Sequence, residues 1–302
     1  MAILLNIILP VFLVVGTAAL AQTRFHLDVR TLSRAAFYLF SPALVLDSLA
    51  TSNVSGTEFG QMTAVLILTT LTLWALGALV ARLLHLEGTT QAAFLIAVLI
   101  MNAGNYGLPV NLFAFGEAGL ARASVYFVGS ALLSASLGVY LSARGQATAQ
   151  LAMRRMLSMP LLHATILGVL LNLADLTVPE TLAKAIHLMG QAAVPSMLLV
   201  LGVRLTEVFQ NRQRMVHLPA LSAVTVLRLI VAPALAWLFA SLVGLNGLAR
   251  DVSVLETAMP TAVMTTILAT EFDSDAPFAA LCVMVTTLVS LPTVTILLYL
   301  LP

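Results

Sequence analysis

The densest group of polar residues inside an apolar stretch lies at residues 101–111, which read Met-Asn-Ala-Gly-Asn-Tyr-Gly-Leu-Pro-Val-Asn. Glycine and proline both weaken a helix, so this segment makes a poor continuous one. In lipid, unpaired backbone groups are costly, and a broken helix is stable only where it lines a protein cavity. The freed backbone groups and the amide side chains predict a binding site formed by Asn102, Gly104, Asn105, Gly107 and Pro109. The alternative is a kink at which glycine allows close helix packing.

A second segment combines a carboxylate with a proline. Residues 256–262 read Glu-Thr-Ala-Met-Pro-Thr-Ala, and Thr265 and Thr266 follow. An ionisable residue within a membrane span is costly to bury and is therefore a functional candidate. We expect Glu256 to bind a cation or to carry a proton. The alternative is that the helix begins late and leaves Glu256 at the outer interface beside Arg250 and Asp251.

The elements that position these segments follow from composition. Of 302 residues, 60% are apolar and only 9% are charged, whereas soluble domains carry about 25% charged residues. A soluble fold of this length has too little interior to hide so much apolar surface. We therefore predict an all-α integral membrane protein surrounded by the lipid bilayer. The net charge of +1 provides no basic surface for nucleic acid.

A spanning helix needs about 20 mainly apolar residues. Ten such runs can be marked, at 3–21, 33–51, 62–84, 91–115, 120–142, 158–175, 183–203, 219–243, 248–270 and 277–300. Most Lys and Arg residues lie in or beside the loops that follow odd-numbered runs, so these loops are expected to be cytoplasmic and both termini outside. The compact loops suggest a bacterial inner (plasma) membrane.

Three sequence matches indicate an internal repeat. Residues 32–35 resemble residues 182–185. Each of these two segments opens an apolar run that contains a proline. Gly-Leu-Pro at 107–109 corresponds to Ala-Met-Pro at 258–260. The common offset is about half the chain, so residues 1–142 and 158–302 form two repeats joined by a cytoplasmic linker at 143–157. Because each repeat has an odd number of helices, the second enters the membrane from the opposite face. Inverted repeats of this kind are shared by many secondary transporters.

This architecture brings the two polar segments together near the membrane midplane. Half-helix N-termini attract anions, whereas half-helix C-termini and freed carbonyls attract cations. We therefore expect a small organic anion at the crossing of helices 4 and 9, with Na⁺ or H⁺ nearby.

The pattern Asn-x-Gly-Asn-x-Gly-x-Pro at residues 102–109 resembles the auxin efflux carrier family, which includes plant PIN-type carriers and bacterial permeases, some associated with malonate. The resemblance covers the whole chain. It implies a scaffold helix group, a transport helix group and two broken helices that cross at the substrate site. It also implies transport of a carboxylate and association as a homodimer.

By this resemblance, Asn102, Asn105 and Pro109 fall on the first crossover and Met259, Pro260 and Thr261 on the second. Many family members carry an asparagine after the second proline, whereas this chain has Thr261 there and Thr265 nearby. These two threonines are therefore candidate substrate contacts.

Residues 256–259 (Glu-Thr-Ala-Met) are similar to the Glu-Thr-Gly-Met stretch of the bile acid/sodium symporters, which share this fold and in which the glutamate binds Na⁺. This likeness makes Glu256, Thr257 and Met259 a candidate Na⁺ site. The resemblance to plant carriers, which are thought to work without coupling to Na⁺, instead favours transport that is not coupled to this ion.

Arg228 lies inside the eighth run. It is expected to neutralise a substrate carboxylate or to pair with Asp47 or Glu256; the alternative is that it snorkels toward the cytoplasm. Asp47 is expected at the outer interface.

The sequence thus predicts a secondary active transporter for small organic anions, with Na⁺ or H⁺ as candidate coupling ions and no other cofactor. The alternative is an uncoupled uniporter or channel. An enzyme is not predicted, because no nucleophile and base pair appears.

Overall fold

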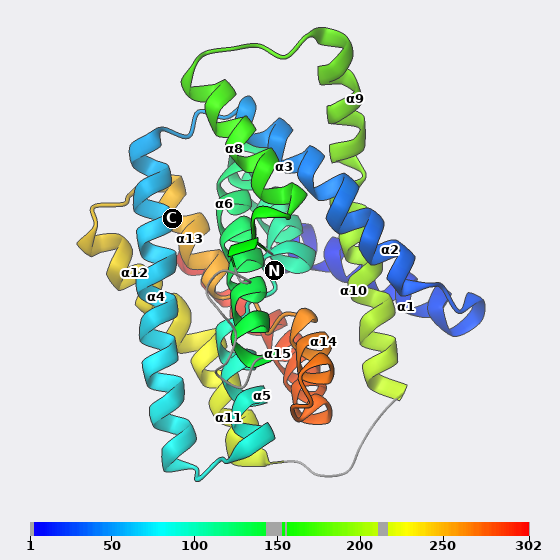
Figure 1. Cartoon of the computed structure of the whole chain (residues 1–302), viewed down its shortest axis with the longest axis vertical. Coiled ribbons are helices and arrows are strands. Elements are labelled where there is room, and N and C mark those ends of the chain that lie inside the picture. Colours follow the sequence, from blue (N-terminus) through cyan, green and yellow to red (C-terminus); the bar gives the residue numbers. More distant parts are fainter. Residues whose placement is uncertain (1–2, 143–152, 155, 211–216, 302) are drawn as a thin grey trace.

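The computed structural model describes residues 3–142, 153–154, 156–210 and 217–301, and most of this part of the chain is helical (Figure 1). The described residues contain no β-strand, and one isolated antiparallel bridge joins Met101 to Thr261. The predicted all-α class is therefore confirmed. Of the predicted linker 143–157, residues 143–152 and 155 lie outside the described part.

Each of the ten predicted apolar runs coincides with one or more helical segments, several of which contain a short π-helical turn (η). The segments are η1 (Leu4–Ile8), α1 (Leu9–Phe25), α2 (Val29–Ala35), η2 (Ala36–Phe40), α3 (Ser41–Ala50), α4 (Gly56–Leu83), α5 (Gly88–Leu99), η3 (Ala103–Gly107), α6 (Leu108–Ser142), α8 (Pro160–Leu173), α9 (Glu180–Gln191), α10 (Ala193–Gln210), α11 (Leu218–Val226), η4 (Leu227–Val231), α12 (Ala232–Leu242), α13 (Gly247–Thr257), α14 (Met264–Glu271) and α15 (Ala276–Leu300).

Within the described residues, six helical stretches are long and apolar enough to cross a membrane: Leu5–Phe25, Gly56–Leu83, Ala103–Ser136, Glu180–Val208, Leu218–Leu242 and Ala276–Leu300. The helices Gly88–Leu99 and Pro160–Leu173 are apolar but shorter. These lengths match the thickness of a bilayer core, which supports an integral membrane protein.

The predicted fourth and fifth runs meet at a kink rather than at an open loop. Gly116 has φ 66° and ψ −160° inside α6, a conformation that suits glycine because it lacks a Cβ. The chain changes direction there, so α6 contains the last third of one predicted span and the whole of the next.

The helices pack in two groups. In one, α1 contacts α10 while α3 contacts α8 and α9; in the other, α4 contacts α5 and α12, α12 contacts α13, and α15 contacts α5, α11 and α14. Figure 1 shows α1, α2, α9 and α10 on one side of the molecule and α4, α11 and α12 on the other. The long helix α6 touches both groups, since it contacts α13, α4 and α3.

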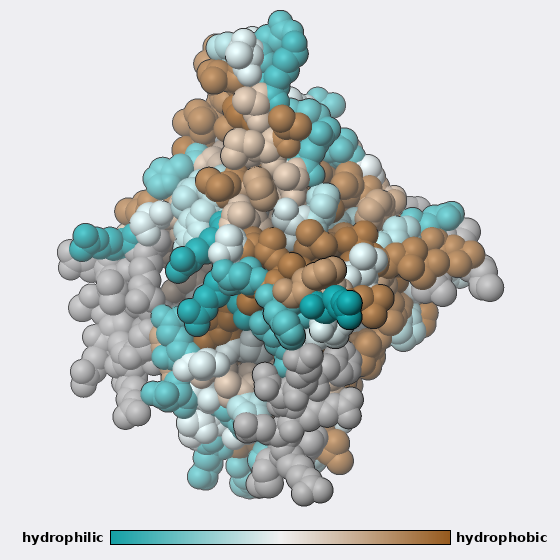
Figure 2. Space-filling view, turned by 90° about the vertical axis from the view of Figure 1, so that its right-hand side faces the viewer, coloured by the Kyte–Doolittle hydropathy of each residue, from teal (hydrophilic) through white to brown (hydrophobic). Residues whose placement is uncertain are grey.

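The outer surface is rich in large apolar side chains. Leu13, Leu20, Trp74, Leu79 and Tyr299 are each at least half exposed. In the space-filling view, hydrophobic residues cover a broad region across the middle of one face, and hydrophilic residues gather just below it beside a recess (Figure 2). Such a surface is stable when lipid covers it.

Several loops meet one another near the two ends of α4. At the end where α4 begins, Asn172 Nδ2 donates to the Ser52 carbonyl at 2.5 Å and Gln61 Nε2 donates to the Val243 carbonyl at 2.8 Å. At the end where α4 stops, the Asp275 amide donates to the Thr89 carbonyl at 3.2 Å. The predicted alternation of all the loops between two faces stays a prediction. Which face is cytoplasmic stays a prediction.

Candidate binding site at two broken helices

The first polar segment interrupts a helix. α5 ends at Leu99, Ile100 is extended (φ −95°, ψ 105°), and the helix resumes only with η3 at Ala103. Pro109 follows as the second residue of α6, directly after the π-helical turn η3. The Gly107 amide donates to the Asn102 carbonyl at 2.9 Å and so joins the break to the new helix.

The second polar segment interrupts another helix, and the two breaks pair with each other. α13 ends at Thr257 and α14 begins at Met264. The Asn102 amide donates to the Pro260 carbonyl at 2.8 Å, and the Ala262 amide donates to the Ile100 carbonyl at 2.9 Å. Each break thus satisfies backbone groups that the other has lost, which in lipid is the condition for interrupting a helix.

Glu256 lies against the first broken helix. It is fully buried, and its Oε1 accepts a hydrogen bond of 2.8 Å from Asn111 Nδ2. A Cβ at Gly107 would overlap the carboxylate, so only glycine leaves room for it. The alternative position at the outer interface is wrong: Arg250 instead pairs with its neighbour Asp251 at 2.9 Å.

Part of this buried group has no hydrogen-bond partner. Glu256 Oε2 and Asn111 Oδ1 are both buried without one. Two oxygens in this state favour a proton or a small cation, because an unpartnered buried acceptor is costly.

Arg228, in η4, is 1% exposed and neither snorkels nor pairs with Asp47 or Glu256. Its guanidinium donates to three backbone carbonyls, those of Val98 at 2.8 Å, Thr257 at 2.5 Å and Met259 at 3.2 Å. The carbonyls of two predicted Na⁺ ligands, Thr257 and Met259, therefore already accept from Arg228.

A cavity of about 480 Å³ borders the first break, within the range of small-molecule sites. It lies between the two helix groups, and its lining includes Arg34, Phe37, Met101, Asn102, Gly104, Asn105, Phe127, Ser130, Met197, Arg204, Val263, Met264 and Glu271. Asn102 is 4% exposed, and its Nδ2 has no hydrogen-bond partner. The cavity therefore has apolar walls, two arginines and a glutamate, and the unpartnered amide of Asn102 is buried in its wall.

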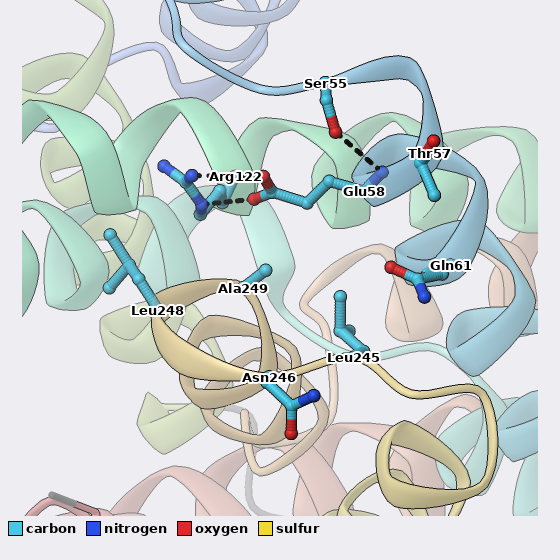
Figure 3. Close-up of a pocket in the computed structure, with 9 residues that line it drawn as sticks. All are labelled: Ser55, Thr57, Glu58, Gln61, Arg122, Leu245, Asn246, Leu248 and Ala249. Atoms are coloured by element: carbon cyan, nitrogen blue, oxygen red, sulfur yellow. Dashed lines mark hydrogen bonds and ion pairs between the residues drawn. The ribbon is translucent and has the colours of Figure 1, made fainter.

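A second hollow, of about 280 Å³, lies where the α3–α4 and α12–α13 loops meet (Figure 3). Figure 3 shows Arg122 pointing at Glu58, and the Arg122 Nε to Glu58 Oε1 distance is 2.5 Å. The Glu58 amide donates to Ser55 Oγ at 3.1 Å. Its charged groups satisfy one another, so this hollow is a structural contact between α4 and α6.

Comparison with known proteins decides the family. Residues 4–298 match the model of a family described as membrane transport protein. An uncharacterized transporter of Methanothermobacter thermautotrophicus is 33% identical over 267 residues, which cover 87% of this chain and 86% of that protein. An uncharacterized transporter of Methanocaldococcus jannaschii is 27% identical over 270 residues, with the same coverage of each. The chain belongs to the membrane transport protein family. This is the auxin efflux carrier family that the asparagine and glycine pattern resembles.

In this membrane transport protein, the predicted substrate residues separate into two sets. Asn102, Gly104 and Asn105 line the cavity. Gly104 also makes room for the cavity wall, since a Cβ there would lie 2.7 Å from the Phe127 ring. Gly107 faces Glu256 instead, and Pro109 begins α6.

The predicted residues of the second break do not line this cavity. Thr261 Oγ1 donates to the Ala97 carbonyl at 2.9 Å, and Thr265 Oγ1 donates to the Ala262 carbonyl at 2.5 Å. The Pro260 carbonyl accepts from Asn102. These polar groups are engaged with backbone, not turned toward the space beside Asn102.

Sequence reasoning missed several lining residues of the transporter. Arg34, Phe37 and Arg204 come from α2, η2 and α10, far in sequence from both breaks. The two arginines entered the prediction through the charge pattern that sets orientation, and Arg34 also through the repeat match at residues 32–35. Nothing in their spacing indicated that they share a cavity with Asn105.

Proposed function

We propose that this transporter is a secondary active carrier for small organic anions such as carboxylates. The observation that carries the proposal is Asn102 Nδ2, a buried donor without a partner at the wall of a cavity of about 480 Å³. A carboxylate is the natural ligand for such a donor, because a hydrogen bond to a charged acceptor is about twice as strong as a neutral one.

The electrostatics of the cavity support an anion. Arg34 and Arg204 line it, opposed by Glu271. Arg204 pairs with Glu207 at 3.1 Å, so its charge is already balanced, and Arg34 is the lining arginine that would attract an anion. The helices that resume after the two breaks begin beside the cavity, near Asn102 and Met264. Their N-termini carry partial positive charge that favours an anion.

The position of the cavity supports a carrier. Phe37 and Met197 belong to one helix group, whereas Phe127 and Met264 belong to the other helix group or to α6. Movement of one group against the other would therefore change access to a ligand held between them, as in alternating access. An uncoupled uniporter or channel for organic anions is the alternative. Saturable flux distinguishes a carrier from a channel, and a fixed stoichiometry with an ion distinguishes a coupled carrier from a uniporter.

The finer architecture is part of the same proposal. Ten membrane crossings form two inverted repeats, residues 1–142 and 158–302, joined at 143–157. The paired breaks after α5 and α13 are their crossover points. We place the protein in a bacterial inner membrane as a homodimer with both termini outside.

Glu256 is the proposed site of coupling to H⁺ or Na⁺. Among the predicted Na⁺ ligands it is the residue that retains an unpartnered oxygen, Oε2. Its contact with Gly107 links that oxygen to the helix that resumes beside the substrate cavity. Binding of an ion at Glu256 would thus affect the structure of the first break.

The proposal is tested by thermal stability and by transport into proteoliposomes, with acetate, malonate and indole-3-acetate as probes. A ligand that binds only the folded protein raises its melting temperature. We expect at least one carboxylate to raise it and to be transported saturably, and Asn105→Ala to abolish both effects. The matched control is Asn246→Ala, which removes an exposed amide next to the second hollow. Equal binding and transport by Asn105→Ala and wild type would remove this cavity as the substrate site.

A further inference from the structure

Arg228 is a fully buried arginine whose position the substrate cavity does not explain. It is 1% exposed, and the cavity lining does not include it. None of the ion pairs found among the described residues involves it. A buried charge without a carboxylate partner is costly, so its surroundings must stabilise it in another way.

The stabilising groups are the ends of two half-helices. Val98 is the last residue but one of α5, Thr257 is the last residue of α13, and Met259 follows in the break. The last carbonyls of a helix have no partner within it, and the helix dipole places partial negative charge on them. Arg228 donates to one such carbonyl of α5 and to two carbonyls of α13 and its break. Its charge is thus balanced by two converging C-termini.

The neighbouring carbonyls of the first break are also occupied. The Ala97 carbonyl accepts from Thr261 Oγ1 at 2.9 Å, and the Met101 carbonyl accepts from Ser130 Oγ at 3.1 Å. The Ile100 carbonyl accepts from the Ala262 amide. Protein donors therefore already use these backbone carbonyls of the crossing, whereas Glu256 Oε2 and Asn111 Oδ1 stay without a partner.

We propose that the guanidinium of Arg228 is a built-in cation that holds the two broken helices together, in the place where the likeness to sodium symporters predicts a mobile Na⁺. The carbonyls of Thr257 and Met259, two of the three predicted Na⁺ ligands, are bound by this side chain. A Na⁺ ion at the same oxygens would meet a fixed positive charge and lose those ligands. The crossing consequently forms without a metal ion.

This inference deepens the proposed function, because it concerns the coupling ion of the same carrier. The inference about Arg228 can be wrong while the proposed function is right. Carboxylate binding and transport report the proposed function, whereas the response to Na⁺ at fixed carboxylate reports the role of Arg228.

The first test uses the wild-type protein and does not depend on any variant folding. Its melting temperature and its carboxylate uptake are measured in Na⁺ and in N-methylglucamine at equal ionic strength. We expect both to be unchanged. A higher melting temperature in Na⁺ that disappears in Glu256→Gln would overturn the inference.

The second test removes the built-in cation. Arg228→Ala leaves three carbonyls without donors, so we expect a large fall in melting temperature and loss of uptake. Added guanidinium ion should restore both in part, because it carries the same N–H donors. Tetramethylammonium, which has the charge but no N–H group, should not. The matched control is Arg82→Ala, at the exposed end of α4, for which neither salt should matter.

Two outcomes of the second test would contradict the inference. A variant Arg228→Ala with wild-type stability would show that the crossing needs no cation at this place. Equal rescue by guanidinium and tetramethylammonium would show that only ionic strength is involved. Arg228→Lys provides a further check, since one ammonium group cannot reproduce the guanidinium fork; we expect its melting temperature between those of wild type and Arg228→Ala.

Discussion

The two broken helices of this transporter differ in what their polar residues contact. In the first break, Asn102 and Asn105 line the cavity, and Asn102 Nδ2 has no partner. In the second break, the hydroxyl groups of Thr261 and Thr265 donate to backbone carbonyls. The polar residues of the two breaks thus differ in their contacts: those of the first line the cavity, and those of the second hold the crossing through backbone carbonyls.

The reason lies in the side chains. A carboxamide has two donor hydrogens and an acceptor, so it can meet a local need and still face a ligand. A threonine hydroxyl has one hydrogen, and near a broken helix it donates that hydrogen to the nearest free carbonyl. The comparison therefore predicts that substitutions in the first break alter ligand binding and those in the second alter stability.

The largest expected effect is on ion-coupled transport. It is expected at Glu256, which belongs to α13 before the second break and contacts Gly107 after the first break. Glu256→Gln replaces a carboxylate that can take up and release an ion by an amide that cannot. We expect accumulation of substrate against a gradient to be abolished, while counterflow exchange continues. The melting temperature should not fall, since the amide can still accept from Asn111 Nδ2 and can donate to Asn111 Oδ1. Accumulation that persists in Glu256→Gln would make Glu256 structural.

The next largest effect concerns the first break. Asn102→Ala removes a donor that lacks a protein partner. A hydrogen bond to a charged group contributes about 1.5–3 kcal/mol, so carboxylate binding should weaken roughly 10- to 100-fold, in line with that range. Stability without ligand should stay as in wild type. Titration calorimetry and thermal melts measure the two quantities. A large fall in stability with unchanged affinity would assign Asn102 to the structure of the break.

A smaller and opposite effect is expected in the second break. Thr261→Val keeps the shape of the side chain but leaves the Ala97 carbonyl without its donor at 2.9 Å. Loss of such a buried hydrogen bond costs about 1–3 kcal/mol of folding stability. Carboxylate affinity should change by less than a factor of about two, well below the tenfold that 1.4 kcal/mol represents. Weaker binding at unchanged stability would place Thr261 in the substrate site and erase the difference between the breaks.

The sequence predicted both breaks because the signals are local. Glycine and proline weaken a helix wherever they stand, and polar residues within an apolar run mark a place where lipid is excluded. The same reasoning favoured a buried position for Glu256 and left the outer interface as its alternative.

The contacts across the fold were not predictable. Arg228 was expected to find a carboxylate, but its partners are backbone carbonyls, which every residue has and no side-chain pattern reveals. Arg34 and Arg204 share a cavity only because α2 and α10 pack side by side. Which hydroxyl is left for a ligand, and which is used by a carbonyl, depends on distances that tertiary packing sets.

The smallest expected effect comes from the charged lining of the cavity. Arg34 is exposed, so water and salt screen its attraction for an anion. Interactions of exposed charges contribute about 0.2–1 kcal/mol; Arg34→Gln should therefore raise the apparent KM for a carboxylate by at most about fivefold, and the difference from wild type should shrink as salt is added. Asn102→Ala should show its larger defect at every salt concentration, because its donor is buried. The two variants are compared by initial uptake rates in low and high potassium chloride. If Arg34→Gln loses as much affinity as Asn102→Ala, and salt does not reduce the loss, then the arginine contacts the carboxylate directly and the ligand lies nearer to α2 than to the first break.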